Sequence, residues 1–326
     1  MQTIAIRVDE SGIIGSGHIS RCIALAQIIK SEYPSINFYS KVISSKTSLI
    51  IKQSGFGQFD IDSEDDFLEK INQDSIVILD GYQFDSKNQL AIKNTLSKLI
   101  CVDDRVKKIH YHCDALINYG IAYSDIDFKK DSTTKLYLGS RYFLLRNAFR
   151  VESLMSLKGK RKSNLFISFG GSDKYRLTEK IITSLDIKKF NEINIVVGNS
   201  KSRARLLSLT SNIKKKIKVH KNLEDYEMLR LMKNSKFAIV PASTLMLEFF
   251  SVGCHLVSGW FAENQKGSLK KYNELRLINN IGRFQVNKIK RIQLNLDKIP
   301  SKKIMRIQKE FTQHSPSDFI EIFKSL

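Results

Sequence analysis

A histidine stands in a glycine-rich turn near the start of the chain, within the sequence IGSGHISR at positions 14–21. A strand-like segment precedes this turn and a helix-like segment follows it. Glycines let the backbone approach an anion, and a helix N-terminus offers free N–H groups and the positive end of the helix dipole. An imidazole can also accept a proton near neutral pH. The turn therefore predicts chemistry on a phosphorylated substrate, with Gly15 and Gly17 binding phosphate and His18 acting as a general base.

Three charged residues lie close to this turn in the sequence: Arg7, Asp9 and Arg21. Arg7 and Asp9 end the first predicted strand, at the sheet edge where α/β proteins bind ligands. They are predicted either to contact a sugar or phosphate or to form a buried ion pair that shapes the loop. Arg21 has the same predicted role in binding, with pairing to Asp9 as its alternative. His18 has the alternative of capping the helix or binding phosphate without catalysis.

Polar residues also follow the later predicted strands of the first half. Tyr82 lies just after the strand predicted at 75–79, and it is expected to hydrogen-bond a sugar or orient a water molecule. A plain turn tyrosine is the alternative. Asn118 ends another predicted strand and is expected to contact sugar or phosphate. Asp103 and Asp104 follow the strand between these two, where an acidic pair is more often a cap or a turn.

A second glycine turn, Gly170-Gly171-Ser172-Asp173, repeats the strand–turn–helix arrangement in the second half of the chain. The backbone N–H groups of Gly170, Gly171 and Ser172 are predicted to bind a diphosphate. The alternative is a tight turn whose last residues cap the next helix. Because the turn duplicates the N-terminal arrangement, the phosphate-binding prediction gains weight.

Five residues further along are predicted to bind the rest of the ligand. Ser243 or Thr244 would cap a helix, and Glu248 lies one turn in, where a carboxylate can accept hydrogen bonds from both hydroxyls of a ribose. These three are the predicted nucleotide-binding residues. The alternative for Glu248 is an exposed glutamate favoured by the helix dipole. Asn264 and Gln265 precede another helix and offer amide donors for phosphate or sugar.

Histidine and cysteine residues form no recognisable metal-binding pattern. His110, His112 and Cys113 are close in sequence, but no carboxylate or distant partner completes a ligand set, so no metal or other cofactor is predicted. The four cysteines are scattered without a C-x-x-C pair, which indicates neither a zinc ribbon nor a disulfide framework. The N-terminus does not resemble a signal peptide, and no apolar run approaches the roughly 20 residues of a membrane span. We therefore expect a cytoplasmic protein.

The chain is strongly basic, with 53 Lys and Arg against 33 Asp and Glu and a formal net charge of +20. Its lysines are dispersed and lack regular aromatic interleaving, so we expect a solvated basic surface rather than a nucleic-acid-binding one. Such a surface would suit anionic substrates or a membrane.

Short β-branched runs alternate with longer helical patterns, which indicates a parallel α/β architecture. A basic stretch around 155–164 interrupts this alternation, and the pattern then restarts. We therefore predict two Rossmann-like domains, 1–155 and 163–326, with a ligand cleft between them. The predicted strands are 3–8, 37–42, 75–79, 99–102, 115–118, 165–169, 193–197, 216–219, 237–240 and 255–258, and the predicted helices include 19–30, 46–53, 65–72, 87–98 and 177–185.

Taken together, these motifs resemble the UDP-2,4-diacetamido-2,4,6-trideoxy-β-L-altropyranose hydrolase family of pseudaminic acid biosynthesis, which is related to the peptidoglycan N-acetylglucosaminyltransferase. The G-x-G-H-x-x-R run at 15–21 is the most specific of them, and the motifs follow in order over most of residues 4–265. The other matching pieces are Arg7-Val8-Asp9, Asp80-Gly81-Tyr82, Val102-Asp103-Asp104, His112-Cys113-Asp114 leading to Asn118, 169–173, Ala242-Ser243-Thr244 with Glu248, and Asn264-Gln265.

The resemblance implies a GT-B-like fold and an enzyme that releases UDP from its sugar with inversion at the anomeric carbon and without a metal. His18 would activate the attacking water, and Tyr82 would help to position water or sugar. The N-terminal domain would carry the sugar and catalytic side, and the C-terminal domain the UDP side.

Two other functions stay open from the sequence. One is a GT-B glycosyltransferase that uses a UDP-sugar donor for surface polysaccharide synthesis. The other is a non-catalytic protein that binds nucleotide sugars or nucleic acid. The expected partners are a UDP-sugar substrate and water as acceptor, with no nucleic acid, and with membrane contact only in the case of a transferase.

Overall fold

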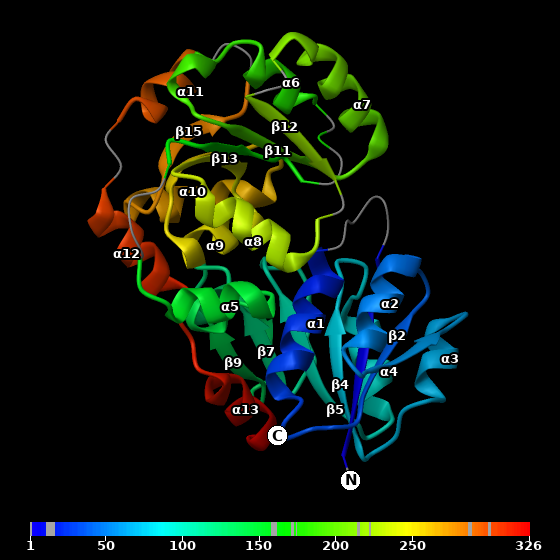
Figure 1. Cartoon of the computed structure of the whole chain (residues 1–326). Helices are drawn as coiled ribbons and strands as arrows, with labels where there is room; N and C mark the ends of the chain where they lie inside the picture. The colour runs from blue at the N-terminus through cyan, green and yellow to red at the C-terminus, as the bar shows by residue number, and fades with distance from the viewer. Residues whose placement is uncertain are drawn as a thin grey trace. The chain divides into compact units, whose positions relative to one another are not determined.

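A computed structural model describes residues 2–10, 17–157, 162–170, 173, 175–213, 216–221, 223–285, 289–298 and 301–326, without the side chains at 264 and 289. The chain forms two compact units (Figure 1). The first consists of Met1–Asn147 together with His314–Leu326, and the second is Ala148–Gln313.

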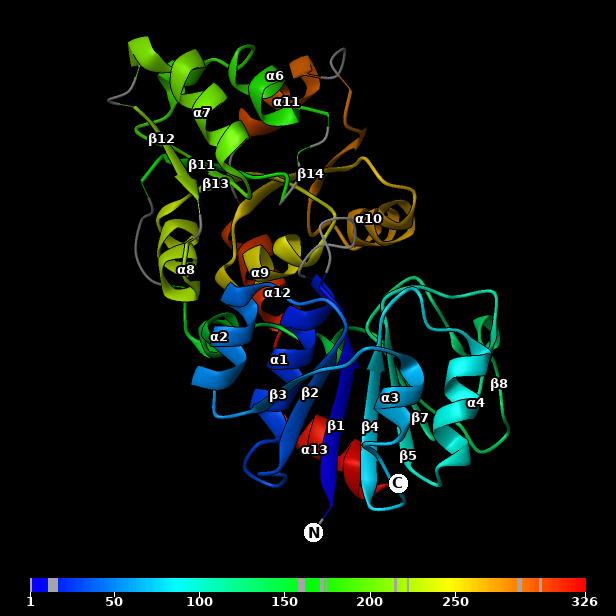
Figure 2. The same ribbon diagram turned by 90° about the vertical axis from the view of Figure 1, so that its right-hand side faces the viewer.

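The first unit is built on a seven-stranded parallel sheet (Figures 1 and 2). In their order across the sheet, its strands are β3 (Gly57–Asp60), β2 (Ile36–Ser40), β1 (Thr3–Val8), β4 (Ser75–Asp80), β5 (Lys98–Asp103), β7 (Ala115–Asn118) and β9 (Lys135–Leu138). A separate parallel pair joins β6 (His110–Tyr111) and β8 (Lys129–Lys130). The helices are α1 (Gly17–Ile29), α2 (Ser45–Gln53), α3 (Glu64–Leu68), α4 (Ser86–Asn94) and α13 (Pro316–Lys324), with short 3-10 turns at Asp125–Asp127 and Ser140–Tyr142.

Burial on both faces of this sheet follows from the alternation of side chains along each strand. Ile4 and Ile6 of β1 pack in one core together with the apolar residues of α1. Ala5, which lies between them, packs in a second core that also contains Phe67 of α3 and Ile92 of α4. The central strands β1 and β4 are therefore buried almost throughout, and their carboxyl ends are fixed by the packing behind them.

The C-terminal helix α13 completes the core of the first unit. Phe319, Ile322 and Phe323 are buried against α1, and the Phe323 ring lies 5.3 Å from the ring of Tyr33. The sequence-based division at 155 and 163 assigns this helix to the second domain. The structure places it with the first unit because its apolar face packs there, whereas most of α5 (Asn147–Leu154) belongs to the second unit.

The second unit contains a six-stranded parallel sheet. In spatial order its strands are β12 (Ile217–Lys221), β11 (Ile193–Val197), β10 (Leu165–Ile167), β13 (Phe237–Pro241), β14 (His255–Trp260) and β15 (Asn279–Arg283). Besides α5, its helices are α6 (Leu177–Ile182), α7 (Ser200–Leu209), α8 (Asp225–Asn234), α9 (Thr244–Val252), α10 (Asn264–Glu274), α11 (Ile289–Leu296) and α12 (Lys302–Phe311), with 3-10 turns at Ile187–Lys189 and Ser211–Ile213. Among all the helices of the described residues, none is long and apolar enough to cross a membrane.

Candidate active site

A histidine and an aspartate meet at the carboxyl edge of the first sheet. Asp80 is the last residue of β4 and pairs in register with Val8 of the neighbouring β1. His18 is the second residue of α1, the helix that follows β1, so the same strand pair positions both groups. The Nδ1 atom of His18 lies 2.6 Å from Oδ1 of Asp80, and both side chains are buried. The sheet edge therefore builds a carboxylate–imidazole pair out of two segments far apart in the sequence.

Arg21 holds the same carboxylate from one helical turn further along α1. Its Nε donates to Oδ2 of Asp80 and its Nη2 to Oδ1, each over 2.5 Å. Burial alone would raise the pKa of Asp80, but the Arg21 guanidinium and the bond to His18 outweigh it and hold that pKa well below its ordinary value. Asp80 is therefore ionised at neutral pH, and the alternative pairing of Arg21 with Asp9 is not what the structure contains.

The ionised state of Asp80 decides which nitrogen of His18 carries the proton. A carboxylate can only accept hydrogen bonds, so the short contact to Asp80 requires a proton on Nδ1. Arg21 Nη2 also lies 2.9 Å from Nδ1, but two N–H groups cannot bond each other, and the carboxylate is the partner that fits. In the neutral ring the lone pair then lies on Nε2, which has no hydrogen bond to any described residue. His18 is thus arranged to accept a proton at Nε2.

Tyr82 packs directly against this imidazole. The two rings meet edge to face, with centroids 4.4 Å apart, and the tyrosine hydroxyl donates to Asp104 over 2.9 Å. The Arg105 guanidinium covers the Tyr82 ring at 3.7 Å. Burial and the Asp104 carboxylate raise the pKa of Tyr82, so its hydroxyl stays protonated at neutral pH. In this structure the Tyr82 ring therefore fixes the orientation of the histidine ring, and its protonated hydroxyl donates a hydrogen bond to Asp104.

A second layer of hydrogen bonds fixes Arg21 itself. Its Nη1 atom donates to the hydroxyl of Tyr119 over 2.6 Å and lies 3.3 Å from Oδ2 of Asp104. The same Asp104 accepts from Tyr82, so the carboxylate links the arginine and the tyrosine on either side of His18. The arrangement leaves the buried guanidinium with carboxylates and a hydroxyl as acceptors, as a buried charge requires.

The predicted residues of β1 and β7 are engaged with protein groups. Arg7 is fully buried and forms paired bonds to Asp9 and to Glu64. These bonds favour the ion pair that shapes the loop, one of the two alternatives left open by the sequence. Asn118 is also buried; it donates to the carbonyl of Arg105 and accepts from the N–H of Gly120. Gly17 is the exposed first residue of α1, and Gly15 lies outside the described residues.

The glycine turn of the second unit is described only in part, because Gly171 and Ser172 lie outside the described residues. Gly170 has a φ of +76°, a left-handed conformation that favours glycine. Asp173 accepts hydrogen bonds from the N–H groups of Leu177 and Thr178 over 2.8 and 3.1 Å. The aspartate therefore caps the first turn of α6, which is the capping role that the sequence left as an alternative for this turn.

The predicted nucleotide residues lie around the start of α9. Ser243 is the N-cap residue, as predicted, but its side chain makes no capping hydrogen bond, and Thr244 is the first helical residue. Glu248 is only 4% exposed, so the alternative of an exposed glutamate is wrong. Gln265 accepts from the backbone N–H groups of Phe261 and Ala262, over 3.0 and 3.4 Å. The side chain of Asn264 lies outside the description.

Three residues complete the first-unit site without having been predicted as site residues: Asp80, Asp104 and Tyr119. Asp80 and Asp104 carried a usable signal, because each stands where a predicted strand ends. The sequence could therefore have suggested a carboxylate at a neighbouring strand end as the partner of His18. The sequence signal for Tyr119 was weaker: this residue directly follows the last residue of β7.

Comparisons with known sequences give three informative relatives, although no protein-family profile matches the chain. An uncharacterised protein of Methanocaldococcus jannaschii is 30% identical over 286 residues, which are 82% of this chain and 58% of that protein. The UDP-2,4-diacetamido-2,4,6-trideoxy-β-L-altropyranose hydrolase of Campylobacter jejuni is 27% identical over 277 residues, 81% of this chain and 94% of the hydrolase. The spore coat polysaccharide biosynthesis protein SpsG of Bacillus subtilis is 24% identical over 55% of this chain and 53% of its own length. The chain thus spans little more than half the length of the first and third relatives.

Solved structures resemble the chain over its whole length. MurG of Acinetobacter baumannii superposes with a TM-score of 0.66 at 9% identity, and all of both chains is covered. The Anabaena protein HepE, solved in complex with UDP, gives a TM-score of 0.60 at 9% identity and the same coverage. Identities this low show the fold alone. With two parallel α/β units and these neighbours, the chain has an α/β, GT-B-like fold, which confirms the predicted fold class.

Proposed function

We propose that the protein is an enzyme acting on a UDP-sugar, and that it hydrolyses UDP-2,4-diacetamido-2,4,6-trideoxy-β-L-altropyranose or a close analogue in nonulosonic acid biosynthesis. One observation carries the proposal: Nδ1 of His18 lies 2.6 Å from Oδ1 of Asp80. An ionised carboxylate there can only accept a hydrogen bond, so we infer that the proton stays on Nδ1 and that Nε2 serves as the base. Similarity to the Campylobacter hydrolase over 94% of that enzyme supports the reaction, and the GT-B-like fold supports a nucleotide-sugar ligand.

In the proposed reaction, Nε2 of His18 removes a proton from water as the water oxygen attacks C1 of the sugar. The new C1–O bond forms on the face opposite the diphosphate, so the anomeric configuration inverts. The bond between C1 and the phosphate oxygen breaks, and UDP leaves with the electron pair. Asp80 stabilises the imidazolium that forms, in the way that a buried carboxylate supports a catalytic histidine. The ring of Tyr82 holds the imidazole in place.

We assign the nucleotide to the second unit. Ser243 and Thr244 stand at the N-terminus of α9, where free N–H groups favour an anion, and their hydroxyls add donors. Glu248 lies in the same helix and would bind the ribose hydroxyls. Gly170, Gly171 and Ser172 would bind the diphosphate, the role that the sequence also predicts for Gly15 and Gly17. Asn264 and Gln265 would add amide donors, and Arg21 and Asn118 would act by positioning the site rather than by touching the sugar.

A glycosyltransferase is the second candidate, because MurG and similar enzymes share the fold. The same histidine would then deprotonate an acceptor hydroxyl instead of water. The two functions differ in the acceptor that they require: a hydrolase releases UDP when water is the only acceptor present.

The decisive experiment measures UDP release from 2,4-diacetamido UDP-sugars in oxygen-18 water, without an acceptor. We expect release with one labelled oxygen in the free sugar and none in UDP. The His18→Asn variant should lose about 100- to 10,000-fold in turnover, the usual contribution of a general base, and should still bind UDP. Lys70→Ala, which removes an exposed ion pair with Asp66, serves as the control and should match the wild type.

Two outcomes would contradict the proposal. Full turnover by His18→Asn would remove the histidine from the mechanism. Release of UDP only after a sugar or lipid acceptor is added would identify a transferase.

A further inference from the structure

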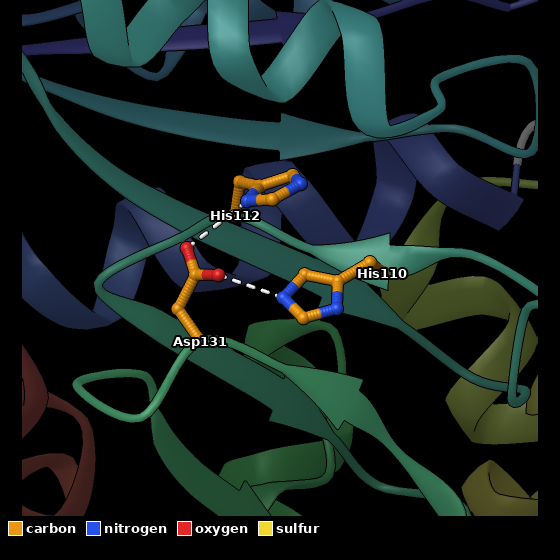
Figure 3. A group of neighbouring side chains, drawn as sticks. All are labelled: His110, His112 and Asp131. Atoms are coloured by element: carbon orange, nitrogen blue, oxygen red, sulfur yellow. Dashed lines mark hydrogen bonds and ion pairs between the residues drawn. The ribbon is translucent and has the colours of Figure 1, made fainter.

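Two histidines and an aspartate form a cluster apart from the His18–Asp80 pair (Figure 3). His110 and His112 are two residues apart, on and directly after β6, and a two-residue spacing along an extended backbone places both side chains on one face. Asp131 directly follows β8, the partner strand of β6. No carboxylate for these histidines could be recognised in the local sequence, because Asp131 lies 19 residues beyond His112 and the strand pairing brings them together.

The three side chains converge on one point. Nε2 of His110 lies 2.7 Å from Oδ1 of Asp131, and Nδ1 of His112 lies 3.0 Å from Oδ2. The ligand atoms of all three residues lie within 4.8 Å of one another. In Figure 3 both rings face the carboxylate. Among the described residues this is the one group of three or more His, Cys, Asp or Glu side chains with that geometry.

Hydrogen bonds hold the backbone of the cluster in place. The carbonyl of His110 accepts from the hydroxyl of Ser86 over 2.6 Å, and the N–H of His112 donates to Oε1 of Gln89 over 2.7 Å. Both partners belong to α4. The N–H of Asp131 donates to the carbonyl of Tyr111 over 3.2 Å, which ties the aspartate to β6. These bonds fix the backbone that carries the three side chains, which is one requirement of a preorganised site.

We propose that His110, His112 and Asp131 bind a divalent late transition metal ion, with Zn²⁺ as the best match. Two imidazole nitrogens and one carboxylate suit Zn²⁺, whereas Mg²⁺ and Ca²⁺ prefer oxygen ligands only. Zn²⁺ bonds of about 2.0–2.2 Å in a tetrahedron place the ligand atoms about 3.3–3.6 Å apart. The nitrogen–oxygen distances of 2.7 and 3.0 Å are shorter, as hydrogen bonds are, so the side chains would rotate slightly apart as the ion replaces the bridging protons.

The site leaves room for one more ligand. The side chains of His110 and Asp131 are 44% and 43% exposed, so a water molecule can occupy the fourth position. A bound ion would also restrain the segment that leads to the candidate active site. Tyr111, between the two histidines, donates to Asp103, which is adjacent to the Asp104 that binds Tyr82.

The test is a calorimetric titration of Zn²⁺ into protein freed of metal with EDTA, with Co²⁺ as a spectroscopic probe of the ligands. We expect one Zn²⁺ per chain, and an affinity at least about tenfold lower in His112→Ala and in Asp131→Asn. Zn²⁺ should raise the melting temperature of the wild type more than that of either variant. Asp131→Asn keeps the shape of the side chain, so it reports on ligation even if His112→Ala is poorly folded.

The matched control is His220→Ala, which removes a histidine of the second unit that bonds Asn194 over 2.8 Å and, within the described part of the chain, belongs to no such cluster. It should bind Zn²⁺ as the wild type does. Absence of saturable Zn²⁺ binding would overturn the proposal and leave a hydrogen-bonded trio. Zn²⁺ binding that persists unchanged in both cluster variants would overturn the proposal as well.

Discussion

The two sheets have the same strand order around their centres but carry different chemistry at equivalent positions. β1 and β4 are neighbours in the first sheet, and β10 and β13 are neighbours in the second. In the first, the strand β4 ends in the buried Asp80, and α1 supplies His18 and Arg21 to it. In the second, β13 ends in Pro241, and the helix after β10 is a short one whose first turn is capped by Asp173.

The carboxyl edges of the two sheets therefore suit two different kinds of chemistry. Buried charges in the first unit satisfy one another and fix a proton on a chosen nitrogen, which suits acid–base chemistry. The second unit has a helix N-terminus at α9 with no side-chain cap, which suits binding of an anionic group. Variants at the two sheet edges should therefore separate these two roles.

The largest effect is expected for Asp80→Asn. This change removes the closest carboxylate of the buried Arg21 guanidinium and leaves Asp104 at 3.3 Å as its ion-pair partner; losing one partner costs about 3–5 kcal/mol in comparable buried pairs. It also removes the group that fixes the His18 proton, so UDP release should fall at least about 100-fold even where the protein stays folded. Chemical denaturation and single-turnover assays measure the two effects.

Asp66→Asn is the control for this variant, because Asp66 forms an exposed pair with Lys70 on the same unit. It should leave both stability and turnover unchanged. Equal behaviour of the two aspartate variants would contradict the role assigned to Asp80.

The two units should also lose stability in different pH ranges. Burial lowers the pKa of His255 and of His220 from 6.5, so their contribution is present above pH 6.5 and is lost as the pH falls below it. The pKa of Asp80 is lowered from 3.8, despite its burial, by Arg21 and His18. Its contribution is therefore present above pH 3.8 and lost only in stronger acid. Hydrogen exchange at pH 7 and pH 5.5, with each rate divided by the intrinsic amide exchange rate at that pH, should show less protection at pH 5.5 in β12 and β14 and little change in β4.

His255→Asn provides the control, because it should reduce the pH dependence of exchange in β14. If β4 opened first on acidification, the assignment of the acid-sensitive groups to the second unit would be wrong.

The smallest effects distinguish two helix starts within the second unit. Asp173→Ala removes two capping bonds of α6 and should cost about 1 kcal/mol of stability. Ser243→Ala removes a hydroxyl that makes no capping bond, so its cost should stay within a few tenths of a kcal/mol. If Ser243 binds the nucleotide, the same variant should weaken UDP binding, as measured by calorimetry, whereas unchanged affinity would exclude that contact.

Most of the fold could be predicted from the sequence because its central strands are continuous apolar runs. β4, with the sequence SIVILD, is buried at every position, and the predicted strand at 75–79 matches it to within one residue. The edge strands β3, β9 and β15 were missed, as were the two-residue strands β6 and β8. The sequences of β3 and β15, GQFD and NNIGR, are polar because an edge strand pairs on one side and is only partly buried. β9, with the sequence KLYL, is four residues long and has no fully buried position.

The candidate site was predictable in position but only partly in its contacts. His18 and Tyr82 were singled out by their places after predicted strands, and the structure brings their rings together. Pairing of Arg21 with Asp80 depends on which strands are neighbours, and β1 and β4 are far apart in sequence. The contact of Asp131 with His110 could not be predicted for the same reason. No local sequence pattern specifies the register of β6 and β8.

Because α13 packs in the first unit, the order of synthesis affects how the two units fold during translation. Phe319, Ile322 and Phe323 fill the core against α1, so that core lacks three of its side chains until α13 has left the ribosome. Every residue of the second unit is synthesised before that point. The later unit can therefore fold first during translation, while the earlier one waits with an open hydrophobic surface that chaperones would recognise.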